Sequence, residues 1–318
     1  MKNLKRENNL IKLYTSCVLL FSLLLVSKLS AQQYPQFTQY TYNMNIINPA
    51  YAGIKNSLSI NIMGRTQWVG VEGAPRTGTL GIHTPLGVKR AFGLGFSAIY
   101  TELGPLKETH LYGDLAYKLE VSNDGFLSFG LKFGTSIQSL NQSLLRFNSN
   151  ESLNTVFNNR TEFNLGFGLF FSQEKFFISA SIPNILNTNF FEVDSSLDNP
   201  NRVSRNSTVF LGSGYVFEIS NSLKMKPAMM LRYSSTVPVA LDVSNTAFID
   251  EIFELGISYR IKESVALIAA LNLNKNLRIG YSYDFSTGNS FNSNGSHEMM
   301  FLYDIDLRDR IRRTPKYF

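Results

Sequence analysis

Cysteine is almost absent from this sequence, and its absence excludes several kinds of site. The single cysteine among 318 residues is Cys17, which lies in an apolar N-terminal stretch. The rest of the chain has no thiol for a disulfide framework or for nucleophilic catalysis. The three histidines, His83, His110 and His297, are far apart and match no metal-ligand spacing. We therefore expect neither a metal nor another cofactor.

Long apolar runs are also missing after the N-terminus. Beyond residue 31 no segment has 18 or more continuous apolar residues, so we expect no membrane-spanning helix. The N-terminus itself has a basic start, the apolar run 17–26 and the small residue Ala31. That order is typical of a secretory signal peptide, and we predict that residues 1–31 are removed. The apolar run is about half the roughly 20 residues that a spanning helix needs, which disfavours a retained anchor.

The predicted mature chain has little net charge. The full sequence carries 30 basic and 24 acidic residues, a net charge of +6, and residues 1–31 hold five of the basic residues and one acid. The remaining 25 basic and 23 acidic residues give +2, so the balance gives no reason to expect a nucleic-acid partner. The one concentrated charge is the tail 308–318, with five basic residues and one acid. Such a tail could dock on an acidic periplasmic partner or simply remain solvated, and Phe318 also resembles a barrel-assembly signal.

Alternation of apolar and polar residues dominates the mature sequence. In 57–68, for example, Leu58, Ile60 and Ile62 are separated by polar residues. Period two predicts strands with one apolar face. Several runs have 10 to 12 residues, whereas strands of soluble domains usually have about five or six and membrane-barrel strands need about 9–11. A soluble β-sandwich or lipocalin-like barrel is the alternative that these lengths disfavour.

Fourteen such strands are predicted, an even number, as in single-chain outer-membrane barrels. Their three longest connections, 139–160, 183–205 and 287–296, all follow odd-numbered strands and so lie on one side. Long loops outside and short turns in the periplasm would place both termini in the periplasm. The predicted strands are 57–68, 77–84, 91–102, 108–120, 126–138, 161–172, 175–182, 206–219, 222–234, 238–245, 251–261, 263–273, 276–286 and 297–307.

The sequence contains few patterns that would indicate an enzyme. The stretch 93–98 fits a G-x-G-x-x-A pattern, but it lies within an alternating strand, and the dinucleotide fingerprint needs a following helix. A Ser/His/acid constellation cannot be assembled from sequence alone. Four acids, namely Asp114, Glu162, Asp242 and Glu254, are expected to face the lumen, where single charges usually tune selectivity or pair with Arg or Lys. We expect no enzyme.

Several stretches of the sequence resemble those of one known protein family. The opening FTQYTYNMNIINPAYAG, the block 65–77, the motif SIPN at 181–184 and the stretches 277–285 and 293–305 resemble the PorP/SprF family of the type IX secretion system. The C-terminal TPKYF is similar as well. The motif residues are Asn48, Pro49, Ala50, Tyr51, Ala52, Gly53, Arg65, Trp68, Pro315, Tyr317 and Phe318.

The resemblance implies a fold and a role. It implies a fourteen-stranded outer-membrane barrel that helps to export or display large surface proteins, including gliding adhesins with a C-terminal secretion domain. It also implies an association with the periplasmic ring of the secretion machine. We accordingly divide the chain into a signal peptide (1–31), a periplasmic N-terminal segment (32–55), the barrel (56–307) and a basic periplasmic tail (308–318).

Two features leave alternatives open. The segment 32–55 either folds back into the barrel, burying Ile46, Ile47 and Tyr51, or forms a turn that caps the barrel bottom. The long loops 139–160 and 183–205 either bind a partner or fold inward as a plug. The apolar residues expected to make a protein contact there are Leu144, Leu145, Phe147, Ile185, Leu186, Phe190 and Phe191. The competing function is a diffusion porin or a transporter of small apolar compounds.

Overall fold

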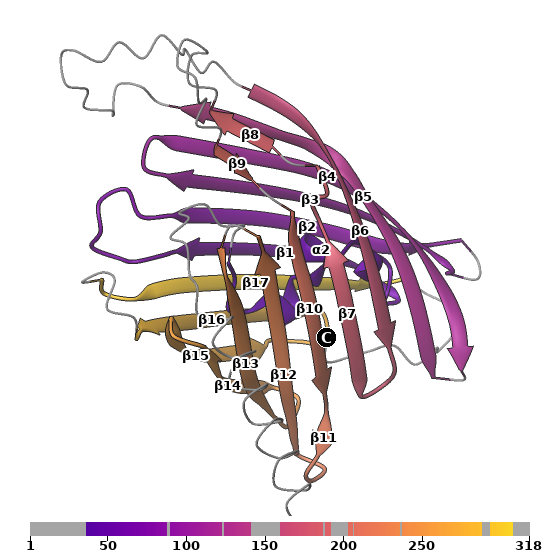
Figure 1. The fold of residues 1–318 in the computed structure, drawn as a ribbon. Coiled ribbons are helices and arrows are strands. Elements are labelled where there is room, and N and C mark those ends of the chain that lie inside the picture. The colour runs from indigo at the N-terminus through magenta and orange to yellow at the C-terminus, as the bar shows by residue number, and fades with distance from the viewer. Residues whose placement is uncertain are drawn as a thin grey trace, which may run out of the picture.

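The chain forms a closed antiparallel β-barrel of fourteen strands (Figure 1). The computed structural model describes residues 36–87, 90–122, 124–140, 160–186, 188–191, 203–205, 207–235, 237–287 and 293–307. The barrel strands are β1 (Ser57–Thr66), β2 (Arg76–Leu86), β3 (Phe92–Leu103), β4 (Leu106–Ser122), β5 (Gly125–Leu140), β6 (Arg160–Ser172), β7 (Phe176–Ile182), β10 (Thr208–Tyr215), β12 (Leu223–Ser234), β13 (Val237–Ile249), β14 (Phe253–Arg260), β15 (Ser264–Asn272), β16 (Leu277–Ser286) and β17 (Ser296–Asp306).

Every strand pairs with its neighbours along the chain, and β17 pairs with β1 to close the ring. All fourteen predicted strands are present, which confirms the predicted fold class. Several strand boundaries differ from the prediction. The predicted strand 206–219 is interrupted at Val216, whose N–H bonds to the Lys175 carbonyl at 2.7 Å. Beyond Val216, two residues form the separate strand β11 (Phe217–Glu218). Strand β13 also runs four residues beyond its predicted end.

The two faces of the barrel wall differ as the period-two pattern predicts. Large apolar side chains such as Leu131, Leu267 and Phe253 point outward and are more than half exposed. Side chains of the opposite parity, such as Asn61 and Ser97, are buried in the lumen. An apolar outer band around a polar interior is the pattern of a membrane-spanning barrel. Among the described residues, no helix is long and apolar enough to cross a membrane.

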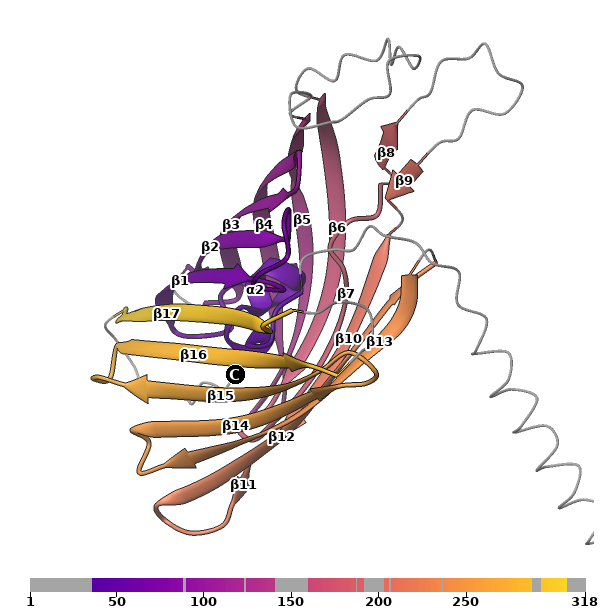
Figure 2. The ribbon, with the colours of Figure 1, turned by 90° about the vertical axis from the view of Figure 1, so that its left-hand side faces the viewer.

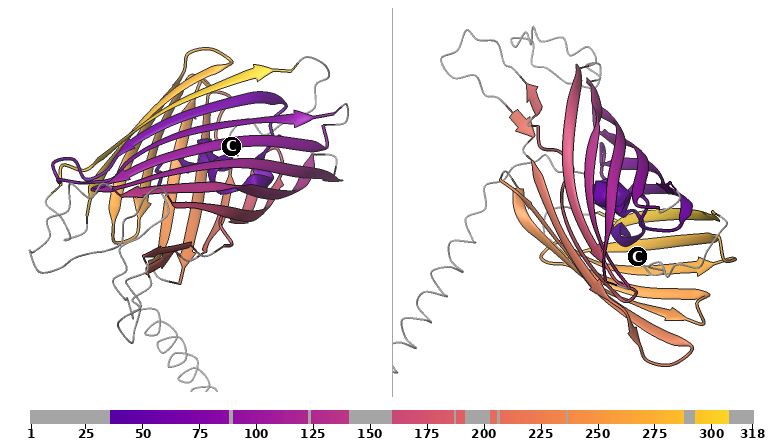
Figure 3. Two further views of the ribbon diagram at one scale, coloured as in Figure 1. Left: turned by 90° about the horizontal axis from the view of Figure 1, so that it is seen from above. Right: turned by 90° about the vertical axis from the view of Figure 1, so that its right-hand side faces the viewer.

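The N-terminal segment lies inside the ring of strands (Figures 2 and 3). It contains the short helices η1 (Tyr40–Tyr42), α2 (Met44–Ile47) and η2 (Pro49–Tyr51). Every residue from Gln36 to Ile54 is buried. Of the two alternatives left open by the sequence, the structure has the inward fold. We call residues 36–54 the plug.

The plug runs between the two ends of the barrel. The longest connections, β5–β6, β7–β10 and β16–β17, leave from one end, here called the loop end, and the other end is called the turn end. Gln36 lies near the loop end, since its Oε1 accepts a hydrogen bond from the last residue of β14, Arg260, at 3.0 Å. Leu307 follows β17 at the turn end. The predicted periplasmic placement of both termini concerns residues outside the described part and stays a prediction.

Strands β7 and β10 are much shorter than the strands β5 and β6 that precede them in the barrel wall. These strands have 7 and 8 residues, whereas β5 and β6 have 16 and 13. Between them the chain forms a separate two-stranded hairpin, β8 (Thr188–Phe191) and β9 (Val203–Arg205). Figure 2 shows this hairpin projecting from the loop end. The hairpin was not predicted, because residues 183–205 are expected from the sequence to form a loop.

Candidate functional site

The plug rests on a row of small residues that crosses the lumen face of five strands. Paired register positions on β3 to β7 are Gly93, Ala116, Gly130, Gly168 and Ser181. A Cβ atom on any of the three glycines would lie well under 3.0 Å from the plug, at Ala52, Ala50 and Asn48 respectively. The wall thus lacks side chains where the NPAYAG backbone approaches it most closely, as glycine permits.

Asn48 fixes the NPAYAG motif to this row. Its side-chain oxygen accepts a hydrogen bond from the Ala50 N–H at 2.9 Å and so caps η2, which begins at Pro49. Its amide nitrogen donates to the Leu169 carbonyl at 2.9 Å and to Ser179 Oγ at 2.8 Å. One asparagine therefore closes a turn within the plug and holds that turn to β6 and β7.

The rest of the motif fills the space beside Asn48. The Tyr51 ring packs edge-on against His83 and Phe170, with centroids 5.2 and 5.3 Å away. Gly53 has a φ of +71°, a conformation that side chains disfavour, and its carbonyl accepts from Lys118 Nζ at 3.2 Å. The NPAYAG motif is thus packed inside the barrel and contributes no exposed surface.

The N-terminal end of the plug, which lies near the loop end of the barrel, is held by charged residues. Arg65 Nη2 lies 2.6 Å from Asp284 Oδ2, and its Nη1 lies 3.0 Å from Glu298 Oε2. Glu298 accepts the backbone N–H groups of Thr38 and Gln39 at 2.9 and 2.7 Å, and the Thr38 hydroxyl donates to Asp284 at 2.8 Å. All of these side chains are buried, so each charge depends on its partners because water cannot solvate it.

Further lumen charges meet the middle of the plug. Tyr42 donates its hydroxyl hydrogen to Glu254, which also pairs with Arg278 at 3.0 Å. Asp114 pairs with Lys132 at 2.7 Å and accepts from the Asn45 amide at 3.2 Å. These contacts confirm that Asp114 and Glu254 face the lumen.

The two remaining predicted acids are paired as well. Asp242 binds Arg260 at 2.6 Å and is buried. Glu162 pairs with Arg160 at 2.8 Å at the loop end of β6. Each of the four predicted acids therefore has a basic partner, which is how lumen charges are usually compensated.

The Trp68 block closes the loop end between β1 and β2. Trp68, Gly70 and Gly73 have φ values of +46°, +94° and +72°, so the connection turns sharply at three residues. The Val69 N–H bonds to the Gly295 carbonyl at 2.9 Å, and the Gly104 N–H bonds to the Gly73 carbonyl at 2.9 Å. The block therefore ties together the connections β1–β2, β3–β4 and β16–β17.

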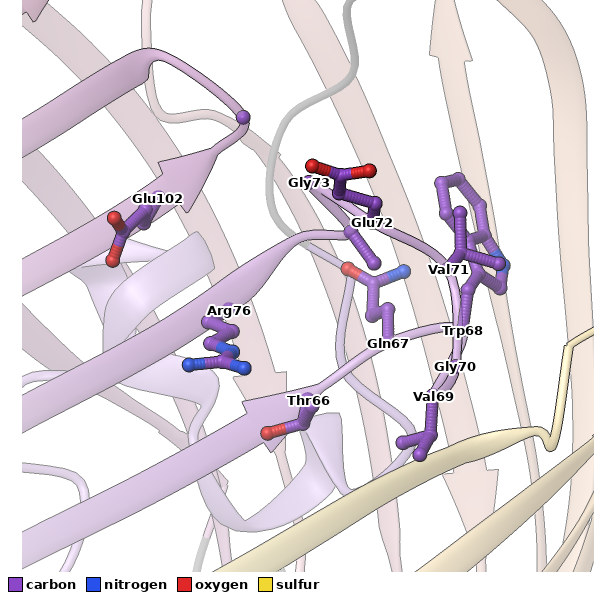
Figure 4. A pocket seen from close by; sticks show the side chains of 12 residues that line it. Thr66, Gln67, Trp68, Val69, Gly70, Val71, Glu72, Gly73, Arg76 and Glu102 are labelled. Carbon is purple, nitrogen blue, oxygen red and sulfur yellow. The ribbon is translucent and has the colours of Figure 1, made fainter. Parts of the chain in front are cut away.

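A cavity of about 380 Å³ lies beside this block (Figure 4). It is lined mainly by residues 66–74, with Arg76, Glu102 and Gly104 on its other side. Arg65 and Trp68 are close in sequence but have different surroundings, because Arg65 points into the lumen and Trp68 belongs to the rim of this cavity.

The predicted protein-binding residues are only partly described. Ile185 and Leu186 lie at the loop end beyond β7 and are 47% and 42% exposed. The side chains of Phe190 and Phe191 lie outside the described part, as do Leu144, Leu145 and Phe147. The motif residues Pro315, Tyr317 and Phe318 lie outside it too, so the role of the tail stays a prediction.

One buried cluster has the residue types of a hydrolase triad. His110 Nδ1 lies 2.7 Å from Ser136 Oγ, and His110 Nε2 lies 3.4 Å from Glu108 Oε2. The second distance is long for a charge-assisted hydrogen bond, and the Tyr112 hydroxyl competes for Nδ1 at 3.1 Å. We interpret the cluster as a lumen hydrogen-bond network. Within the described residues, no group of three or more His, Cys, Asp or Glu could hold a metal.

A comparison with protein families identifies the chain. Residues 29–303 match the family described as type IX secretion system membrane protein PorP/SprF. The chain belongs to the PorP/SprF family. The match covers the plug and almost the whole barrel of this family member. A comparison with functionally curated proteins finds no match.

Solved membrane barrels are similar to this PorP/SprF protein at low sequence identity. The Acinetobacter baumannii outer membrane protein Omp33 is 9% identical with a TM-score of 0.43, and the alignment covers 79% of this chain and 99% of that chain. A Pseudomonas aeruginosa FadL homologue is 11% identical with a TM-score of 0.44, covering 86% and 95%. The CymD monoaromatic hydrocarbon channel is 11% identical with a TM-score of 0.48, covering 84% and 99%.

Several residues of the site have no counterpart among the sequence predictions. They are the wall partners of the plug, including Ser179, Asp284, Glu298 and Lys118. The available signal was the lumen parity of polar residues on the strands, which indicates that a side chain points inward but does not indicate what it meets there.

The row of small residues predicts a sharp effect of one methyl group. In Gly130→Ala the new Cβ would collide with the Ala50 nitrogen, so the NPAYAG turn must leave its seat. We expect protease to cleave residues 36–54 at least roughly tenfold faster in detergent, a loss of local stability of about 1.4 kcal/mol or more. The control is Gly78→Ala, because a Cβ there has no neighbour within 4 Å. Equal cleavage of both variants would contradict the close seating.

The buried charges predict a large cost for removing Arg65. Arg65→Met leaves Asp284 and Glu298 buried without their cation, and breaking a buried ion pair from one side costs about 3–5 kcal/mol. We expect the free energy of unfolding to fall by this amount when the barrel is unfolded with urea in lipid vesicles. Arg76→Met is the control, because Arg76 is exposed at the loop end and most exposed substitutions change stability by about 0.5 kcal/mol or less. Equal unfolding midpoints would show that Arg65 does not hold the plug.

Proposed function

We propose that this PorP/SprF protein binds a secreted surface protein at the loop end of its barrel and displays it there, without catalysing a reaction. The client is a gliding adhesin or a similar large protein with a C-terminal secretion domain. Family membership supports the link to type IX secretion. A second contact, with periplasmic ring components, belongs to the turn end.

The observation that carries this proposal is the filled lumen. A barrel that acts by conducting solutes needs an open or gated interior, whereas residues 36–54 are buried between the strands. The accessible surfaces are then the outer wall, which faces lipid, and the two ends. Long connections gather at the loop end, and connections of this kind commonly carry binding function.

Ile185 and Leu186 are the described apolar side chains that best fit a client contact. Both are exposed at the loop end, on the connection that follows β7. Apolar groups in a protruding connection favour association with another protein surface. The alternative function, diffusion or transport of small apolar compounds, would require the plug to move aside.

The experiment is a mild-detergent purification of the tagged protein from native outer membranes, with mass spectrometry of what co-elutes. We expect the intact chain to recover a large surface protein. The double variant Ile185→Ser with Leu186→Ser should recover roughly tenfold less, because it removes exposed apolar contact area. Ile219→Ser is the matched control, since Ile219 is 61% exposed at the turn end.

Two outcomes would contradict the proposal. A barrel that elutes alone and conducts ions in a planar bilayer would favour the porin. Loss of the client in Ile219→Ser, but not in the double variant, would place the client at the wrong end.

A further inference from the structure

We propose that the loop-end edge of β6, at residues 160–163, binds an extended segment of the client by adding it to the sheet as a further strand. This inference rests on the proposed function and names the chemistry of the contact. It follows from one irregularity of the barrel, namely that the strand next to β6 ends before β6 does.

The ladder between β6 and β7 is incomplete. It runs from Ser172, paired with Phe177, to Phe167, paired with Ile182. Towards the loop end β6 continues for seven more residues, still paired with β5 as far as Arg160. On its other edge this extension has no paired strand among the described residues.

Pro183 ends the ladder. Proline has no N–H to donate, and it is tolerated in sheets only at edges and ends of ladders. The chain then crosses the lumen face of β6, where the Pro183 carbonyl accepts from the Asn164 amide at 2.9 Å. Gly166 makes room for this crossing, because a Cβ there would lie 2.5 Å from the Pro183 oxygen.

Among the described residues, the last backbone hydrogen bond between this segment and β6 is at Leu165. The Ile185 N–H bonds to the Leu165 carbonyl at 2.7 Å. Beyond it, β8 and β9 pair with each other in a separate sheet and do not rejoin β6 (Figure 2). Within the part of the chain that the structure describes, the last residues of β6 at the loop end therefore have a paired strand on one side only.

The direction of the backbone groups on this edge follows from Leu165. Because successive residues of a strand point their N–H and C=O groups to alternate edges, Thr161 and Phe163 point the same way as Leu165, away from β5. They offer two N–H groups and two carbonyls at the spacing of a β-ladder. Such a row pairs with an extended peptide.

The position of this edge suits a partner that arrives from the aqueous side. The edge lies at the loop end, and its lumen side carries the partly exposed ion pair of Arg160 and Glu162, whose side chains are 37% and 17% exposed. Phe163 is 78% exposed, more than any other large apolar side chain described. If a client strand paired with this edge, one of its outward-facing side chains would lie beside the Phe163 ring and cover it.

The edge has only some of the devices that block strand addition. Natural edges are blocked by charged side chains, by proline or by a bulge, and in this edge the two charged residues, Arg160 and Glu162, pair with each other. Here the residues 160–163 are Arg-Thr-Glu-Phe, and the ladder with β5 is regular through them. Closed barrels normally have no edge at all, so this one has the character of a binding feature.

The test compares two substitutions at Thr161 in the same purification from native outer membranes. Thr161→Pro removes one edge N–H and places a ring against an incoming strand, yet it removes no hydrogen bond to β5. Thr161→Val keeps the N–H and nearly the same shape. We expect Thr161→Pro to recover at least fivefold less client than the intact chain, and Thr161→Val to recover the same amount.

A second measurement guards against misfolding of the proline variant. Phe163→Cys introduces a thiol into a chain whose only other cysteine is Cys17. Its labelling by a membrane-impermeant maleimide should be strong on the purified barrel and at least fivefold weaker on the barrel with client bound. This readout needs no proline.

The outcomes separate the inference from the proposed function. If the intact chain recovers no client, the proposed function fails and the inference fails with it. If the intact chain and Thr161→Pro recover equal amounts of client, only the strand-addition inference is overturned. Unchanged labelling of Phe163→Cys in the presence of client would overturn it as well.

Discussion

The close contact between the NPAYAG turn and the glycine row of the wall is the constraint on which the rest of this structure depends. A ring of fourteen strands encloses more space than its inward side chains fill when many of them are glycine and serine. In this protein that space accommodates a piece of the chain itself. The wall residues Gly93, Gly130 and Gly168 lack side chains where the plug backbone passes.

A lumen that is lined by charged residues and filled by the plug has a second requirement. Each buried charge needs a partner, because water no longer reaches it. Arg65, Asp284 and Glu298 satisfy one another and also bind Thr38 and Gln39 of the plug. The same groups therefore stabilise the barrel and hold its contents, so loss of the plug would expose several unsatisfied acids and bases at once.

Because residues 36–54 fill the lumen, the two ends of the barrel are the surfaces that face water. The Trp68 block binds three connections together at the loop end, which gives that end a fixed frame. Beside it, the short strands β7 and β10 leave the loop-end edge of β6. Rigid connections and one incomplete ladder at the same end are consistent with a surface that receives another protein.

Much of the barrel was predictable because its physical signal is local. Period two in runs such as 57–68 and 161–172 reports directly which side chains meet lipid and which meet the lumen. The parity of the long connections predicted that they share one end. Asp114 and Glu254 were placed in the lumen for the same reason.

The site was less predictable because its contacts join distant parts of the chain. Thr38 and Glu298 are separated by 260 positions, and no periodicity reports such a pair. The split at Val216 and the hairpin β8–β9 depend on tertiary contacts in the same way. The sequence indicated that NPAYAG was a special turn, but only the row of wall glycines explains what the turn is for.

The most direct test of this account is the conductance of the purified barrel in a planar bilayer, with and without residues 36–54. The account predicts that the intact chain carries almost no steady current, and that the shortened chain opens a stable pore through the polar lumen. A large steady conductance of the intact chain, unchanged by the deletion, would contradict the claim that the plug seals the barrel.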